Sequence, residues 1–309
     1  MFKRSTVRAR GLVLAGLVAG ATTAGVVSAP DSGTASAASP EVSMAVSSSK
    51  QTVKYGKRIG LTGRVNAGGA KGIKLEHADS RGTFRPVASS RTTADGSYRF
   101  LVKVRKSGTY RAVSENGAST APQRVTVVAA LKAKGTKHVL GGRASKVRGK
   151  LLPSTRGHKV ALQVKTGHGW KTVKRTATGK GGRFRASFTP RHPGRYRVRV
   201  RTAGTAAAAG TKSKSWRVNA YRGSAASWYG PGLYGNKLGC GGTLTPGTVG
   251  AANKHLPCGT KVTFHYRGRT VTAPVVDRGP YAGNREWDLT PGLKAKLGFG
   301  STGTVWTTK

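Results

Sequence analysis

Short stretches of alternating apolar and polar residues recur through the middle of the chain. In the run 159–165 valine and leucine occupy every second position, and in the run 196–201 tyrosine and valine alternate with arginine. A period of two places the apolar side chains on one face of a β-strand and the polar ones on the other. Glycine-rich turns separate these runs. The pattern therefore predicts a fold built mainly from short strands.

Three landmarks of the first half recur at a fixed distance of 86 residues further along. A fixed offset of this kind is typical of an internal duplication. The landmark pairs are Gly63 and Gly149, Gly96 and Gly182, and Tyr110 and Tyr196. Each copy has room for about seven short strands, which predicts one immunoglobulin-like β-sandwich in residues 42–129 and a second in residues 130–219. The pair resembles the bacterial immunoglobulin-like repeats that serve as spacers and adhesive modules on secreted proteins.

Two alternating runs near the C-terminus predict a β-hairpin. The runs 262–266 and 271–275 each place apolar residues at every second position, with Gly268 between them. Glycine suits the tight turn that joins two such strands. Asp277 has the same parity as the apolar residues of the second run, so we expect it at the strand end on the inward-facing side.

A short helix is expected soon afterwards. Thr290 is a favourable N-cap residue and Pro291 suits the first helical position. Leu293 and Leu297 then lie one turn apart, and Gly298 is a typical C-terminal stop.

The N-terminus has the pattern of a secretory signal peptide. Residues 1–10 carry four basic side chains, residues 11–27 are small and apolar, and Ala35 and Ala37 form an Ala-x-Ala cleavage site. We predict a signal peptide over residues 1–37 and a linker over 38–41. The alternative is an uncleaved membrane anchor, but the apolar run is diluted by Gly, Ala and Thr and is marginal for spanning a bilayer. After cleavage the protein would be secreted, with no stable membrane span.

The net charge of the chain indicates which class of partner it binds. The chain has 309 residues with 55 Lys plus Arg, nine Asp plus Glu and a net charge of +46. So few acids and only two cysteines argue against a metal cage built from carboxylates or cysteines, and no motif for an organic cofactor is present. Residues 130–222 hold 25 basic residues and no acidic one. This excess is either a solvated surface or a binding face for a polyanion. Export argues against nucleic acid and leaves teichoic-type phosphate polymers, peptidoglycan carboxylates and anionic lipid. Among these we expect anionic cell-wall polymers such as teichoic acids.

Three motifs in the last 84 residues resemble one known family. They are Ala-Ser-Trp-Tyr-Gly at 226–230, Leu-Pro-Cys-Gly-Thr at 256–260 and Asp-Arg-Gly-Pro at 277–280. Their order is similar to that of the rare lipoprotein A (RlpA)-like double-psi β-barrels, a fold also found as the first domain of expansins. The resemblance implies a six-stranded double-psi β-barrel with a short helix in residues 223–309. The expected fold class of the chain is therefore all-β.

The resemblance also implies an activity. Active members are lytic transglycosylases that cleave peptidoglycan glycan strands, particularly strands stripped of peptides. Asp277 matches their catalytic acid, and its alternative role is to cap its own turn. Active relatives carry a Glu near the position of Gly242 and a His at that of Asn253, whereas here the histidine is His255. We take His255 as the second catalytic candidate.

Other residues of this domain are candidates for binding glycan or for stability. The proposed substrate-binding residues are Asn253, Thr243, Trp228, Tyr229, Tyr281 and Arg278. Aromatic faces of this kind can stack on sugar rings, although each could equally belong to the core. Cys240 and Cys258 are the only cysteines of an exported domain, which favours a disulfide over a catalytic thiol. Two alternatives to cleavage are an expansin-like barrel that binds the cell wall without catalysis and a purely structural wall adhesin.

Overall fold

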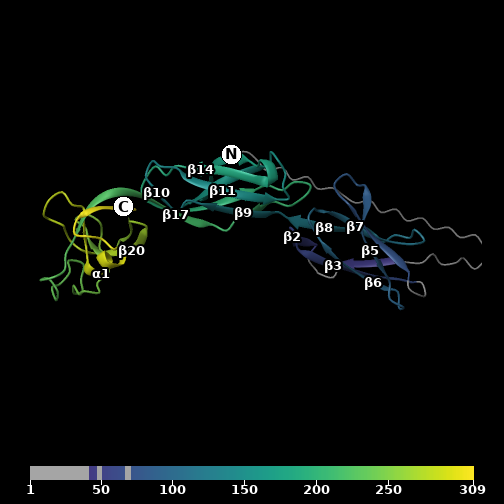
Figure 1. Ribbon diagram of the computed structural model, residues 1–309, viewed down its shortest axis with the longest axis horizontal. Helices are drawn as coiled ribbons and strands as arrows, with labels where there is room; N and C mark the ends of the chain where they lie inside the picture. Colours follow the sequence, from purple (N-terminus) through teal and green to yellow (C-terminus); the bar gives the residue numbers. More distant parts are fainter. Residues whose placement is uncertain (1–41, 47–50, 67–70) are drawn as a thin grey trace, which may run out of the picture. The chain divides into compact units, whose positions relative to one another are not determined.

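The computed structural model describes residues 42–46, 51–66 and 71–309. The predicted signal peptide and linker lie outside the described residues. Within the described part, β-strands make up nearly all of the regular structure, and they gather into separate groups of sheets (Figure 1). No described helix is long and apolar enough to cross a bilayer. The predicted all-β class is confirmed, with one short α-helix in the C-terminal part.

The first copy of the repeat is a sandwich of two sheets. Its core is formed by side chains that alternate along the strands, among them the fully buried Leu61, Leu75 and Val127. The smaller sheet has the order β1 (Val42–Val46), β3 (Arg58–Val65) and β6 (Ser97–Lys103). The larger sheet has the order β2 (Thr52–Lys54), β8 (Gln123–Val128), β7 (Gly108–Ser114), β4 (Gly72–Ala78) and β5 (Phe84–Arg91).

The second copy repeats this arrangement. Its core includes the fully buried Leu162, Val198 and Val218. The smaller sheet has the order β14 (Arg183–Phe188), β11 (Ser145–Leu152) and β9 (Ala130–Gly135). The larger one has the order β13 (Gly169–Ala177), β12 (Lys159–Thr166), β15 (Gly194–Thr202), β17 (Trp216–Trp228) and β10 (His138–Leu140), with β16 (Thr211–Lys212) added to β15. A single 3₁₀ turn, Lys180–Gly182, precedes β14.

One glycine–aromatic pair shows the duplication at atomic level. Gly63 pairs with Tyr98 across β3 and β6, and 86 residues later Gly149 pairs with Phe184 across β11 and β14. A Cβ atom on either glycine would lie within 2.4 Å of the partner ring. Glycine is therefore required in both copies because the aromatic ring of the neighbouring strand lies across it. Both sandwiches thus share strand order and this packing detail.

Six strands close into a ring at the C-terminal end. The ring runs β17, β21 (Trp287–Leu289), β18 (Ala251–Ala252), β20 (Arg269–Asp277), β19 (Lys261–Tyr266) and β22 (Gly303–Thr307). It closes because β22 pairs with both β19 and β17. This six-stranded ring confirms the predicted barrel. The residues 219–223, where we expected one domain to end and the next to begin, lie inside the continuous strand β17.

The barrel core contains the predicted hairpin and helix. Phe264 of β19 faces Val271 of β20, and Phe264 packs edge to face on the fully buried Trp287 at 5.0 Å between ring centroids. Helix α1 (Pro291–Leu297) buries its two leucines, and Gly298 ends it with a φ of +62°. Thr290 occupies the N-cap position but does not cap the helix through its side chain. Its hydroxyl instead binds main-chain groups of Gly250 and Thr248, which ties the helix start to the loop before β18.

Candidate active site

The carboxylate of Asp277 lies where β20 ends, as its parity in the sequence predicted. Its Oδ1 accepts hydrogen bonds from the main-chain N–H groups of Gly239 at 2.7 Å and Arg278 at 2.8 Å. Its Oδ2 accepts one from the hydroxyl of Tyr229 at 2.9 Å. Three donors from three segments of the barrel therefore fix the carboxylate in one orientation. The bond from Arg278 N–H shows that Asp277 also stabilises its own turn, so the two expected roles coexist.

The hydrogen bond from Gly239 is possible because the main chain of Gly239 lies close to the carboxylate of Asp277. A Cβ atom at Gly239 would lie 3.0 Å from Oδ1 of Asp277 and 3.1 Å from Cγ of Arg278. Any larger residue there would push against the carboxylate. The next residue, Cys240, donates its N–H to the carbonyl of Val276 at 3.2 Å and forms the predicted disulfide with Cys258. The disulfide is confirmed, and it anchors the segment that carries the Gly239 donor.

The guanidinium of Arg278 is occupied by the barrel itself. It donates to the carbonyl oxygens of Asn253 at 3.2 Å and Leu256 at 2.6 Å, and to Sγ of Cys258 at 3.0 Å. These contacts hold the loop 253–258 against the end of β20. Arg278 therefore positions this loop, and its part in substrate binding stays a prediction.

Asn253 is a buried turn residue, with only 4% of its surface exposed. Its Oδ1 accepts the N–H groups of His255 at 3.0 Å and Leu256 at 2.8 Å, and its Nδ2 donates to the carbonyl of Glu286 at 3.1 Å. This Asx turn leads the chain out of β18. The imidazole of His255 is exposed and forms no hydrogen bond with a described residue, so the catalytic role of His255 stays a prediction.

A second carboxyl group shares the surroundings of Asp277. Asp288 of β21 accepts a 2.8 Å hydrogen bond from the hydroxyl of Ser227, its partner on β17. Burial, with a further contribution from the negative charge of Asp277, raises the pKa of Asp288. Burial also raises the pKa of Tyr229, and the charge of Asp277 adds to this effect. The phenol therefore keeps its proton and acts as a hydrogen-bond donor.

The aromatic candidates differ in how far solvent reaches them. Tyr281 follows the Asp-Arg-Gly-Pro motif and is 79% exposed, and Tyr234 is 42% exposed. Trp228 is half-buried against the barrel core, and the ammonium of Lys294 lies 3.9 Å from its ring centroid. Trp287 is fully buried, so it belongs to the core. Tyr281 is therefore the candidate with an open aromatic face.

The segment around Gly242, where the resemblance implies a Glu in active relatives, is a glycine turn. Gly241 and Gly242 both have positive φ, +91° and +79°, and open space lies beside both Cα atoms. Thr243 is exposed after this turn. Left-handed backbone at two successive positions favours glycine, which explains why no side chain projects here.

The sequence did not single out two of the groups around Asp277. The Ser227–Asp288 pair depends on the register of β17 against β21, and the N–H of Gly239 reaches Asp277 from a loop that Cys240 ties to Val276 of β20. Among the described residues, no group of three His, Cys, Asp or Glu side chains is placed to hold a metal ion.

Comparison with known proteins places this barrel in a family. Residues 222–307 match the family described as lytic transglycolase. These residues form an RlpA-like domain.

Several curated relatives resemble the RlpA-like domain. The endolytic peptidoglycan transglycosylase RlpA of Campylobacter jejuni is 43% identical over 82 residues, which is 26% of this chain and 30% of that protein. A probable endolytic peptidoglycan transglycosylase RlpA of Synechocystis is 38% identical over 88 residues, covering 28% of this chain and 27% of that protein. The chain thus spans less than a third of the length of these relatives.

Solved structures similar to the chain include repeats of a large adhesion protein and a domain of intimin. A tetra-tandem repeat in the extending region of a large adhesion protein covers 87% of this chain and 73% of its own, with 12% identity and a TM-score of 0.33. The D0-D1 domain of intimin covers 57% of this chain and 97% of its own, with 14% identity and a TM-score of 0.25.

Proposed function

We propose that the protein cleaves or remodels the glycan strands of peptidoglycan, as a secreted protein of the cell wall. The observation that carries this proposal is the carboxylate of Asp277, which three donors hold at the strand end within an RlpA-like domain. The curated relatives named above are endolytic peptidoglycan transglycosylases, which supports the same substrate class.

In this proposal Asp277 carries the proton through a lytic transglycosylation. Protonated Asp277 donates its proton to the glycosidic oxygen as the bond from that oxygen to C1 of the sugar breaks. The 6-hydroxyl of the same sugar then attacks C1, and its proton returns to the carboxylate. One sugar leaves with a free hydroxyl and the other closes an anhydro ring, so no water is consumed and Asp277 ends protonated as it began. One carboxyl group is enough for this cycle.

The neighbouring groups have supporting roles. The hydroxyl of Tyr229 and the N–H of Gly239 orient the carboxyl group, because each binds a different oxygen. Asp288, with its raised pKa, adds a second carboxyl that retains a proton more readily than an exposed aspartate. We propose that His255, Thr243 and Tyr281 contact the glycan from the exposed rim.

A barrel that binds glycan without cleaving it is the alternative. The glycine turn at Gly242 favours this alternative, because active relatives carry an acid there. The buried amide of Asn253 favours it as well, because it replaces a histidine of those relatives with a group already bound to the main chain.

Incubation of the purified protein with peptide-stripped glycan separates the two functions. Cleavage predicts soluble fragments that end in an anhydro sugar, whereas the expansin-like alternative predicts co-sedimentation with the glycan and no fragments. If the protein neither cleaves nor binds this glycan, both proposals for the barrel are wrong.

We also propose that the basic second sandwich keeps the protein on anionic polymers of the wall, such as teichoic acids. The support is its charge, 25 basic residues without an acidic one in residues 130–222.

A further inference from the structure

The outer face of the β14–β11–β9 sheet carries two rows of cations. Arg148 in the central strand lies opposite Arg185 on one side and Lys134 on the other. Two residues along, Lys150 lies opposite Arg183 and Lys132. All six side chains are exposed, because they alternate with the residues that face the core. Each row therefore sets three positive charges side by side across three strands.

A trough runs between the two rows. It has a volume of about 860 Å³, and all six cations line it. Its floor is the row of Ala133, Gly149 and Phe184, whose side chains point inward, and Gly149 adds none. Neighbouring strands lie about 4.8 Å apart and alternate residues about 6.7 Å apart, so the rows present a positive charge every few ångströms along the trough.

Nothing within the described chain neutralises these charges. None of the six side chains forms a hydrogen bond or ion pair with another described residue. Like charges directly opposite on neighbouring strands are destabilising. A face that keeps two such rows opposes folding to some degree, which indicates that the charges serve a partner from outside.

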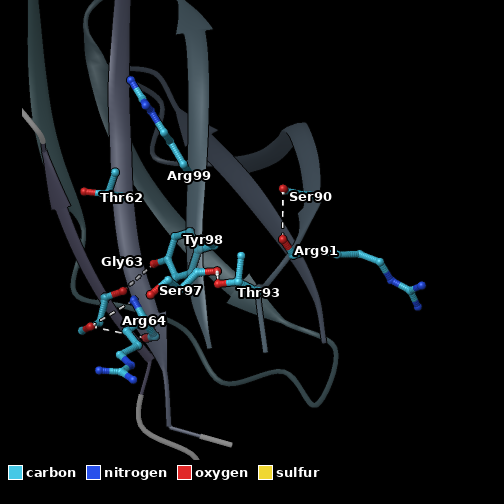
Figure 2. Close-up of a pocket in the computed structure, with 10 residues that line it drawn as sticks. Thr62, Gly63, Arg64, Ser90, Arg91, Thr93, Ser97, Tyr98 and Arg99 are labelled. Carbon is cyan, nitrogen blue, oxygen red and sulfur yellow. Dashed lines mark hydrogen bonds between the residues drawn. The ribbon is translucent and has the colours of Figure 1, made fainter. Parts of the chain in front are cut away.

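The first sandwich contains the same trough without the charge rows. Its volume is about 700 Å³, and eight of its lining residues stand 86 positions before lining residues of the second trough. Thr62 occupies the place of Arg148 and Ser97 the place of Arg183. Arg64 lies 3.8 Å from the carboxylate of Asp95, and in Figure 2 the side chains of Arg64, Arg91 and Arg99 point in different directions. The double row is therefore specific to the second copy.

We propose that the trough of the second sandwich binds a linear phosphate polymer that has no bases, such as a polyol phosphate chain. Arginine's planar fork matches phosphate oxygens, and three of the six cations are arginines. The one aromatic residue of the lining, Phe184, is 4% exposed, so a nucleic acid would find no surface for base stacking. This inference rests on the proposed location in the wall for the source of the polymer, but not on glycan cleavage.

The test uses the purified full chain and a fluorescent poly(glycerol phosphate) chain, with affinity measured at several salt concentrations. The test variant combines Arg148→Thr with Arg183→Ser, which installs the residues that the first sandwich has at the same places. We expect affinity to fall about tenfold or more, because each cation beside an anionic surface contributes measurably. We also expect a shallower salt dependence. Arg148→Gln with Arg183→Gln is the second variant and should behave alike.

A control variant with the same change in net charge tests whether binding depends on the position of the cations in the trough. Lys165→Gln with Lys171→Gln removes two exposed cations from β12 and β13 outside the trough. The control should lose at most about twofold in affinity. Equal losses in control and test variants would show that only net charge matters, and the proposal would be wrong.

Competitors test the chemistry of the ligand. Polyphosphate should displace the probe, whereas polyglutamate and orthophosphate at equal anion concentration should do so poorly. Displacement by polyglutamate as readily as by polyphosphate would overturn selectivity for phosphate. Tighter binding of single-stranded DNA than of poly(glycerol phosphate) would overturn the choice of a base-free polymer. The Asp277→Asn variant should bind the polymer normally, so failure of glycan cleavage and failure of polymer binding are separate results.

Stability gives a further readout for the same variants. Removing Arg148 relieves two like-charge contacts, so the Arg148→Thr, Arg183→Ser protein should unfold at the same or a higher temperature than the wild type. A marked drop in unfolding temperature would show a structural role for these side chains and would contradict the proposal.

Discussion

The hydroxyl of Tyr229 donates a 2.9 Å hydrogen bond to Oδ2 of Asp277. Tyr229 directly follows β17 and Asp277 ends β20, so two non-adjacent strands of the ring meet in this contact. Because burial and the charge of Asp277 raise the pKa of Tyr229, the phenol remains a donor throughout the physiological pH range. Tyr229 and Gly239 thus each support one oxygen of this carboxylate.

Replacing Tyr229 by phenylalanine removes the bond to Oδ2 while keeping the ring. If Asp277 donates the proton, the phenol stabilises the carboxylate that forms, and the rate of glycan cleavage in the variant should fall about tenfold to a hundredfold, the range for a hydrogen bond to a charged group. The rate of fragment release measures this. Tyr266→Phe is the control, because the hydroxyl of Tyr266 forms no hydrogen bond with a described residue. Unchanged cleavage in Tyr229→Phe would argue against an orienting role for the phenol.

Gly239→Ala should displace the Asp277 carboxylate. Its Cβ would lie 3.0 Å from Oδ1, closer than almost all side-chain contacts, so the carboxylate or the loop must shift. We expect a loss of cleavage of about tenfold or more with the barrel still folded, because small misplacements of a catalytic group are costly. Gly300→Ala serves as control, since open space surrounds its Cβ position. Equal activity of the two variants would show that the approach of Gly239 to Asp277 is not needed.

The raised pKa of Asp288 predicts how stability depends on pH. A carboxyl group whose pKa is higher in the folded state favours folding while it is protonated and loses that advantage as the pH rises from the unfolded value of 3.8 to the folded one. Asp288→Asn should therefore raise the unfolding temperature at pH 7, and the gain should disappear as the pH falls below about 4. Scanning calorimetry at several pH values measures this.

Asp79→Asn supplies a control of opposite sign. The main-chain N–H of Arg81 lowers the pKa of Asp79, so its charged form favours folding above the usual aspartate range. Asp79→Asn should therefore give no increase in unfolding temperature at pH 7. A gain of the same size in both variants would show that net charge, and not the burial of Asp288, governs the effect.

Loss of the disulfide should destabilise the barrel. Cys240 and Cys258 are 18 residues apart, and closing a loop of this length contributes roughly 3 kcal/mol in the chain-entropy model. We expect the double variant Cys240→Ser, Cys258→Ser to have a lower free energy of unfolding by about this amount, measured by denaturant titration. A change below about 1 kcal/mol would indicate that hydrogen bonds to Arg278 and Val276 alone hold the loop.

Local patterns in the sequence were sufficient to predict most of the fold. The period of two predicted the hairpin of β19 and β20, and helix α1 begins at Pro291 and ends before Gly298 as expected. The 86-residue repeat predicted two like sandwiches, which share a glycine–aromatic pair. These features depend on residues that are close in sequence or repeat at a fixed spacing.

Contacts between strands that lie far apart along the chain could not be predicted from the sequence. The pairing of Ser227 with Asp288 depends on a parallel register between β17 and β21, and the cation rows on the outer face of β11 depend on its register with β9 and β14. The role of Thr290 could not be predicted for the same reason. Its hydroxyl binds main-chain groups of Gly250 and Thr248 instead of capping the helix. Asn253 looked available for substrate, but its amide builds the turn after β18.

The most direct measurement of the central claim is mass spectrometry of peptide-stripped glycan after incubation with the wild-type protein and with Asp277→Asn. The wild type should release fragments that end in an anhydro sugar, and Asp277→Asn, which keeps the size of the side chain and still offers an acceptor oxygen to Gly239, should release essentially none. Fragments of the same kind and amount from both proteins, or none from the wild type, would contradict catalysis by Asp277.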